Sequence, residues 1–140
     1  MPYPIAFLTG AFASDLAARA TKDTFWGRAS NWLLGAGIVA GVAAGAVGAI
    51  GYYTIRRARE SKVGRLHAMG NPAALGLAVA SLALRRGPPI PGPGAVVLTA
   101  AMSVLLGVTA WVGGELSYTH MVGVKGYDDQ HSDQEKRYVA

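Results

Sequence analysis

The sequence predicts an all-α protein, an integral membrane four-helix bundle formed by one domain. Three observations support this prediction. About half of the 140 residues are hydrophobic (51%), and only 15% are charged. The apolar residues form long blocks, and the block at 32–55 contains no charged residue, whereas a helix needs only about 20 apolar residues to cross a bilayer. The basic residues fall between these blocks, as they do in membrane proteins.

The predicted spans cover residues 4–20, 32–55, 63–84 and 95–122, and a polar tail follows at 125–140. The first span is the weakest, because Asp15 interrupts it after eleven residues. The second has Trp32 near one end and Tyr52 and Tyr53 near the other, as expected for interfacial anchors. A soluble bundle would require a polar stripe on every helix, and residues 32–55 offer none.

Three polar segments are predicted to connect the spans: 19–30, 56–62 and 85–94. The last is too rich in proline and glycine to be helical. We expect Asp15 to lie at the membrane interface and to pair with Arg19, four residues further along the first helix; the alternative is a buried functional carboxylate. Because Met1 is followed by Pro-Tyr-Pro and no basic region, no cleavable signal peptide is predicted and the first apolar segment is expected to be retained.

With four spans, both termini lie on the same side of the membrane, and the basic residues then predict the orientation. Eight of them fall on the side of the termini and five on the other, which favours cytoplasmic termini in the inner membrane of a bacterium. The eight are Arg56, Arg57, Arg59, Lys62, Arg65, Lys125, Lys136 and Arg137, and the five are Arg19, Lys22, Arg28, Arg85 and Arg86.

The composition excludes several classes of function. The chain has no cysteine, which rules out disulfides, thiolate catalysis and cysteine-ligated metal sites. Its net charge is +5, but the basic residues form no separate basic surface, so no nucleic-acid partner is predicted. Motifs of hydrolases, zinc peptidases and nucleotide-binding proteins are absent, and a stand-alone enzyme is the least favoured interpretation.

A row of small residues marks one face of the second span. Gly37, Gly41 and Gly45 are spaced by four, and Gly48 continues a parallel row of alanines. Small residues allow helix backbones to approach closely in lipid. This pattern predicts close packing against a neighbouring helix, either within the bundle or in a second protomer of a homo-oligomer.

Polar residues of the third and fourth spans are expected to meet at one end of the bundle. His67 begins the third span and His120 ends the fourth, so antiparallel helices bring both to the same end of the membrane. Two histidines at one depth could ligate a metal ion or the two axial positions of a haem. The alternative is that they face headgroups and only fasten helix ends by hydrogen bonds.

Three further polar residues accompany the two histidines in the sequence. Asn71 lies one turn from His67, and Glu115 and Tyr118 share one face of the fourth helix. Glu115 lies about 140° around the helix from His120, so these two side chains are not expected to bind one ion together.

The stretch WVGGELSYTHMVGV resembles the closing motif of a bacterial membrane-protein family catalogued as domain of unknown function 2231. MPYPIAFLTGAFASDLA is similar to the family's opening helix, RLHAMGN to the start of its third helix, and FWGRASNWLLGAGIVAG to its second. The resemblance covers about residues 2–124. It matches His67, His120 and Glu115 to family residues, whereas a His-Pro that commonly precedes the first helix is absent here.

Some relatives in this family are joined to Rieske-type or cytochrome c-type domains, so the resemblance implies a place in membrane electron transfer. The leading hypothesis is therefore a subunit that binds a b-type haem or a metal ion between His67 and His120 and relays electrons within a respiratory or photosynthetic complex. Glu115, Tyr118 and Asn71 would orient and tune the ligands. The rival hypothesis is a cofactor-free accessory subunit that stabilises a larger membrane complex, and a small transporter comes third.

Overall fold

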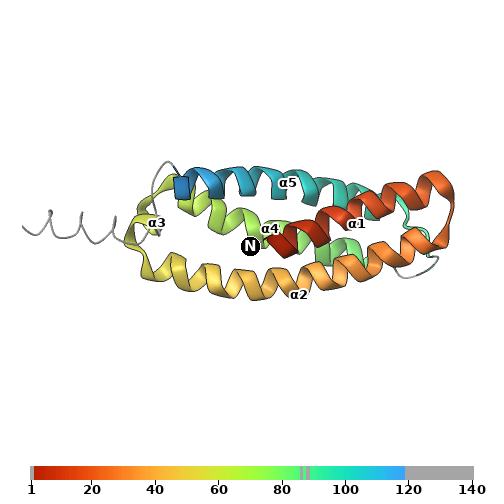
Figure 1. Ribbon diagram of the computed structural model, residues 1–140, viewed down its shortest axis with the longest axis horizontal. Coiled ribbons are helices and arrows are strands. Elements are labelled where there is room, and N and C mark those ends of the chain that lie inside the picture. The colour runs from red at the N-terminus through yellow and green to blue at the C-terminus, as the bar shows by residue number, and fades with distance from the viewer. Residues whose placement is uncertain (1, 86, 88, 119–140) are drawn as a thin grey trace, which may run out of the picture.

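The computed structural model describes residues 2–85, 87 and 89–118, apart from the side chain of residue 57. Within these residues the chain is all-α, as predicted. Four long helices and one short helix follow one another (Figure 1). They are α1 (Pro2–Thr21), α2 (Thr24–Thr54), α3 (Arg56–Glu60), α4 (Lys62–Ala83) and α5 (Pro93–Tyr118). The expected tail at 125–140 lies outside the described residues.

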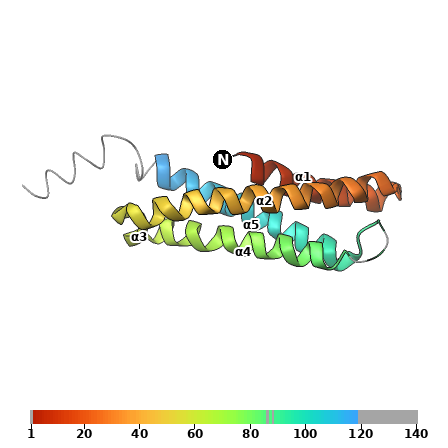
Figure 2. The same cartoon turned by 90° about the horizontal axis from the view of Figure 1, so that it is seen from below.

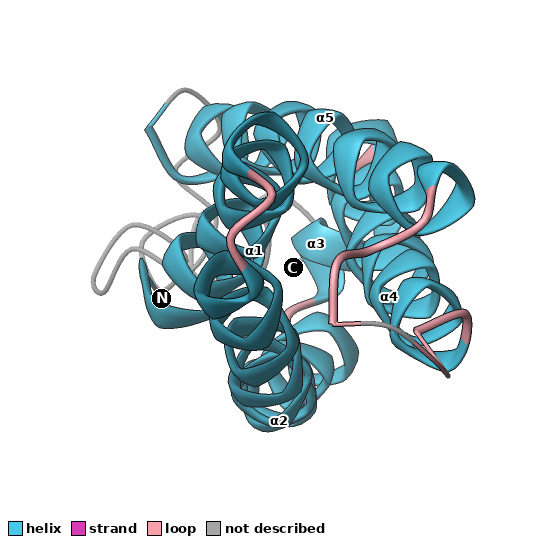
Figure 3. Ribbon diagram, turned by 90° about the vertical axis from the view of Figure 1, so that its right-hand side faces the viewer, coloured by secondary structure: helices cyan, strands magenta, loops and turns pink. Residues whose placement is uncertain are grey.

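The four long helices form an antiparallel bundle in which α1 packs mainly on α2, and α4 on α5. Contacts of α2 with α4 and of α1 with α5 close the ring, which is visible along the bundle axis in Figure 3. Residues 22–23 and the described residues between α4 and α5 lie at one end, here called the loop end, and α3 lies at the other (Figures 1 and 2). Residues far apart in sequence therefore meet at each end.

The first connection is much shorter than the predicted segment 19–30, because α2 begins at Thr24 rather than near Trp32. Asp23 caps this helix, and its side chain accepts a hydrogen bond of 2.8 Å from the Phe25 amide. Lys22 has a positive φ of 58°, which reverses the chain in two residues. The predicted basic turn contains α3, and the Ser61 side chain caps α4 through the Gly64 amide.

Three helices are long and apolar enough to cross a membrane: α2, α4 and α5. The first predicted span forms a helix of 20 residues, but α1 is not among the three. Ser14, Asp15 and Arg19 lie within its last two turns, and this polar content lowers its hydropathy. Four spans were expected, and the described residues contain three candidates.

The interior of the bundle is made of small side chains. Its buried apolar cluster contains three alanines among seven residues: Leu8, Ala11, Leu34, Ala74, Ala78, Met102 and Leu106. Large apolar side chains instead cover the outside, with Trp32, Val39, Val97, Val104 and Trp111 all at least 65% exposed. Such a surface is unsuited to water and suited to the hydrocarbon of a bilayer.

The predicted glycine face of α2 divides into a packed part and an open part. A Cβ on Gly37 would lie 2.5 Å from the Leu8 side chain of α1, and one on Gly41 would lie 2.8 Å from the Leu75 side chain of α4. Gly45 and Gly48 are exposed, and a Cβ at either position would meet nothing within 4 Å. Close packing therefore occurs over the first half of this face within the chain.

Candidate functional site

A buried ion pair joins Asp15 of α1 to Arg85, which lies just after the end of α4. The guanidinium of Arg85 donates from Nη1 to Oδ1 of Asp15 at 2.8 Å and from Nη2 to Oδ2 at 2.6 Å. The side chains are 4% and 0% exposed, respectively. Thr99 of α5 donates a third hydrogen bond of 2.7 Å to Oδ2 of Asp15. Both charges are thus neutralised inside the loop end of the bundle, in the two-bond geometry that arginine and carboxylate favour.

Two serine hydroxyls extend the ion pair to the remaining backbones. Ser30 of α2 accepts from Nη1 of Arg85 at 3.0 Å and donates to the carbonyl of Ala11 in α1 at 3.0 Å. Ser81 of α4 accepts from Nη2 at 3.3 Å and donates to the carbonyl of Ala95 in α5 at 3.0 Å. All four long helices therefore contribute to one network, the arginine cluster, which consists of Asp15, Ser30, Asn31, Ser81, Arg85 and Thr99.

The expected pairing of Asp15 with Arg19 is wrong, because Asp15 faces inward to Arg85 and Arg19 donates to the carbonyl of Pro91 at 3.1 Å. Sequence reasoning placed Arg85 only in a loop and missed its role. The available signal was the run of polar residues within otherwise apolar spans, since polar side chains in a membrane segment usually face the bundle interior. Ser81 and Thr99 carry that signal, and both are fully buried.

The second polar group, the histidine cluster, consists of His67, Asn71, Thr109 and Gly113 and joins α4 to α5 near the α3 end. Nδ1 of His67 lies 2.9 Å from the carbonyl oxygen of Thr109, and Nε2 lies 3.1 Å from Nδ2 of Asn71. A carbonyl only accepts, so Nδ1 carries the proton, and Nε2 accepts from the amide. Both ring nitrogens of His67 are therefore engaged. Asn71 also donates to the backbone carbonyl of His67 at 2.8 Å.

The imidazole ring lies directly against the backbone of α5. A Cβ on Gly113 would be 2.7 Å from Cε1 of His67, a distance that real contacts do not reach. One turn further along α4, a Cβ on Gly70 would collide with the methyl group of Thr109. The two helices are therefore as close as glycine allows at the level of the histidine, which leaves no room there for a macrocycle between them.

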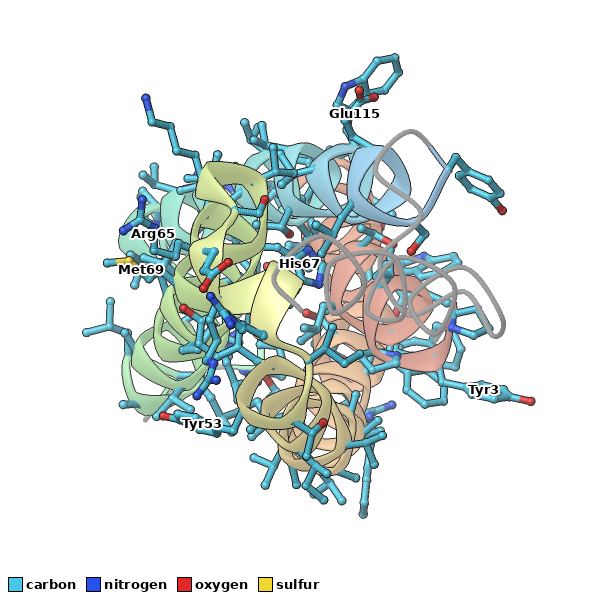
Figure 4. All side chains as sticks on the ribbon, turned by 90° about the vertical axis from the view of Figure 1, so that its left-hand side faces the viewer. Tyr3, Tyr53, Arg65, His67, Met69 and Glu115 are labelled. Atoms are coloured by element: carbon cyan, nitrogen blue, oxygen red, sulfur yellow. The ribbon has the colours of Figure 1, made fainter. Side chains whose placement is uncertain are left out.

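The structure brings together only part of the predicted ligand set. Asn71 contacts His67 as its spacing suggests, and His67 points toward the bundle interior (Figure 4). Glu115 and Tyr118 have exposed side chains, and Glu115 points outward from α5 in the same view. His120 lies outside the described residues. Among those that are described, no three histidine or acidic side chains are grouped to hold a metal ion.

The helical architecture, the apolar exterior and the three candidate spans define an all-α integral membrane protein. Residues 1–126 match the family described as "Predicted membrane protein (DUF2231)". The chain belongs to this family, as its resemblance to the family predicted. No curated protein and no solved structure matches the sequence.

Proposed function

We propose that the chain is a cofactor-free accessory subunit that docks onto a larger membrane complex through the open part of the inner face of α2. The observation that carries this proposal is a row of residues on one face of α2 that is buried at first and becomes exposed further along the helix. Gly27, Ser30, Leu34 and Gly37 are buried at alternating spacings of three and four. Continuing the same spacings leads through Gly41 and Ala44 to Gly48, which is exposed.

Helix α1 shields this face of α2 only as far as its own amino end (Figure 1). The amino end of α1 lies opposite the middle of α2, and beyond it the remainder of α2 has no α1 beside it (Figure 1). Gly45 and Gly48 lie in this remainder, with open space where a Cβ would project. Association of helices in lipid relies on close approach at small residues, so a helix of a partner subunit suits this stretch.

The interior polar groups support a structural role rather than a relay or a catalytic one. Asp15 accepts two hydrogen bonds from Arg85, which follows α4, and one from Thr99 of α5, and both ring nitrogens of His67 are engaged. A proton relay or a general base requires a titratable group that reaches a substrate or a water chain. Here each group is engaged in fastening one helix to another.

The proposal is tested by the size of the native assembly. Membranes that express the tagged full chain are solubilised in mild detergent and separated by blue-native electrophoresis, with the partners identified by mass spectrometry. Gly45→Leu with Gly48→Leu blocks the open stretch, and Gly76→Leu with Gly107→Leu is the matched control, because a Cβ at these exposed positions also meets nothing within 4 Å.

The wild type and the control should migrate in a large assembly, and the Gly45/Gly48 variant should migrate at the mass of the isolated chain. A wild type that runs alone, or a blocking variant that stays in the assembly, would overturn the proposal. An assembly containing only this chain would replace the accessory role with homo-oligomerisation through the same stretch.

The second candidate function is binding of a metal ion or a haem, with His67 and His120 as the two ligands. One observation favours it: the Nδ1 proton of His67 is directed to a backbone carbonyl, as in most metal-ligating histidines. The packed residues do not fit a haem between α4 and α5, and Nε2 would first have to lose Asn71. This candidate therefore requires the histidine cluster to open.

A visible absorption spectrum with and without dithionite, together with metal analysis, distinguishes the two candidates. If His67 is a ligand, Asn71→Ala frees Nε2 and should raise the bound metal or pigment, whereas His67→Ala should abolish it. If His67 only fastens helices, protein supplied with haem and metals should remain unloaded in the wild type and in both variants.

We further propose that the protein lies in the bacterial inner membrane with the α3 end in the cytoplasm. Basic residues cluster around α3, whereas Arg85 at the loop end is neutralised by Asp15. Because the chain has no cysteine, single substitutions Arg59→Cys and Lys22→Cys report the orientation in intact cells. An impermeant maleimide should label the second and spare the first, and the reverse pattern would invert the orientation.

A further inference from the structure

We propose that the outer face of α2 holds one anionic phospholipid, with its phosphate at Arg28 and Asn31 and one acyl chain in an apolar groove below them. Two hollows on this helix carry the inference. The first, of about 280 Å³, is lined by Arg28, Asn31 and Trp32. The second, of about 560 Å³, is apolar and is also lined by Trp32. Trp32 lines both, so the two hollows adjoin along α2, the polar one before the apolar one.

The polar hollow presents two hydrogen-bond donors to an anion. Arg28 is exposed, and its guanidinium reaches only the Thr24 hydroxyl, at 3.5 Å, among the described residues. The Asn31 carbonyl oxygen accepts from Arg85 at 3.2 Å, which turns the amide nitrogen of Asn31 to the other side. The buried arginine cluster thus orients the second donor. A planar guanidinium beside an amide suits the oxygens of a phosphate.

The groove has the length and the apolar lining that suit one acyl chain of a single leaflet. It is bordered by Trp32, which is 82% exposed, and its floor is made of small or short side chains. From residue 32 to residue 43 an α-helix rises about 16 Å, close to half of the roughly 30 Å hydrocarbon core. The residues of the groove are Trp32, Gly35, Ala36, Val39, Ala40 and Ala43.

The position of Arg28 along α2 agrees with a headgroup. The helix has 31 residues and is about 46 Å long, which exceeds the hydrocarbon thickness, and its apolar run begins near Trp32. Arg28 stands one turn before this run, at the level where basic side chains meet phosphates. A partner helix in the same groove would need a negative charge at that level, and an anionic phospholipid always has one.

This face differs from the one that carries the accessory-subunit proposal. At 3.6 residues per turn, the groove residues and Arg28 project from the side of α2 opposite the stripe of Gly37, Gly41 and Gly48. Lipid binding and subunit docking therefore use separate surfaces. An experiment that contradicts one of these two proposals leaves the other untouched.

Quenching of Trp32 fluorescence by brominated lipid tests the inference in the full chain. Trp26→Phe with Trp111→Phe leaves Trp32 as the only tryptophan, and the protein is reconstituted in phosphatidylcholine vesicles. A small fraction of dibrominated phosphatidylglycerol or of dibrominated phosphatidylcholine is then added. The matched control retains only Trp111, which is 76% exposed and lies toward the α3 end of α5.

We expect the anionic lipid to occupy the site near Trp32 about fivefold more readily than the neutral lipid, the factor that one basic side chain contributes near a membrane surface. Arg28→Gln should reduce this ratio to about one, and Arg65→Gln, an exposed residue of α4, should leave it unchanged. Gly35→Leu should weaken quenching by both lipids, because it fills the groove and its Cβ meets nothing within 4 Å.

Equal quenching of Trp32 by the two lipids would overturn the inference. The same holds if the preference survives Arg28→Gln, or if Trp111 shows an equal preference, since either result would assign the effect to the membrane surface as a whole.

Discussion

Removing the carboxylate of Asp15 should be the most damaging single change in the bundle. Asp15→Ala deletes three hydrogen bonds of 2.6–2.8 Å and leaves the Arg85 charge 4% exposed and without its counter-ion. Breaking a buried pair in this way costs about 3–5 kcal/mol. At about 4 °C per kcal/mol for a chain of this size, Tm should fall by roughly 12–20 °C.

The assay is thermal unfolding followed by circular dichroism at the helical minimum, in one mild detergent for all variants. The control is Glu60→Gln, which removes an exposed ion pair of 2.7 Å with Arg56 and should shift the free energy of unfolding by less than about 1 kcal/mol. Asp15→Leu with Arg85→Met should recover most of the lost Tm, because an apolar pair of similar volume leaves no unpaired charge. A Tm for Asp15→Ala within the range of the control would refute the reasoning.

Two glycine substitutions test the close contacts of the bundle by the same unfolding assay. Gly113→Ala should lower the free energy of unfolding by about 1–3 kcal/mol, because the new Cβ would lie 2.7 Å from the His67 ring and must displace it. The control Gly114→Ala, whose Cβ has its nearest contact at 4.0 Å, should have little effect. Equal effects of the two substitutions would contradict the packing of the histidine cluster. Gly27→Ala places a Cβ in collision with the carbonyl oxygen of Pro89 and should displace the loop. The displacement should appear as faster proteolysis between α4 and α5 at unchanged helix content, and an unchanged cleavage rate would contradict this contact.

The positions of the helices could be predicted because the apolar blocks are long and their ends carry local signals. Ser61 and Asp23 are helix caps that act within three residues, and the proline-rich segment cannot be helical. The predicted second span begins at Trp32, later than α2, because hydropathy marks where the apolar run begins and not where the helix begins. The turns before Trp32 are helical but polar, and hydropathy does not distinguish them from a loop.

The candidate site was predicted only where both partners lie on one helix. Asn71 and His67 are four residues apart, and helical geometry alone brings them together. Asp15 and Arg85 are 70 residues apart, and their pairing depends on how four helices are arranged around the loop end. A nearby arginine at i+4 offered a local alternative that the tertiary structure overrides, since a buried carboxylate gains more from two-bond pairing than an exposed one gains from a surface contact.

The placement of the polar groups explains how a bundle with so small an apolar core keeps one arrangement. In lipid the burial of apolar side chains gives little preference for one helix pairing over another, so hydrogen bonds and close backbone contacts must provide it. The arginine cluster fastens all four helices at the loop end, and the histidine cluster fastens α4 to α5 near the α3 end. Neither cluster reaches the last turns of α2, where Gly45 and Gly48 lie open. Neither cluster therefore holds that stretch to the bundle, which supports the proposal that a partner subunit packs there.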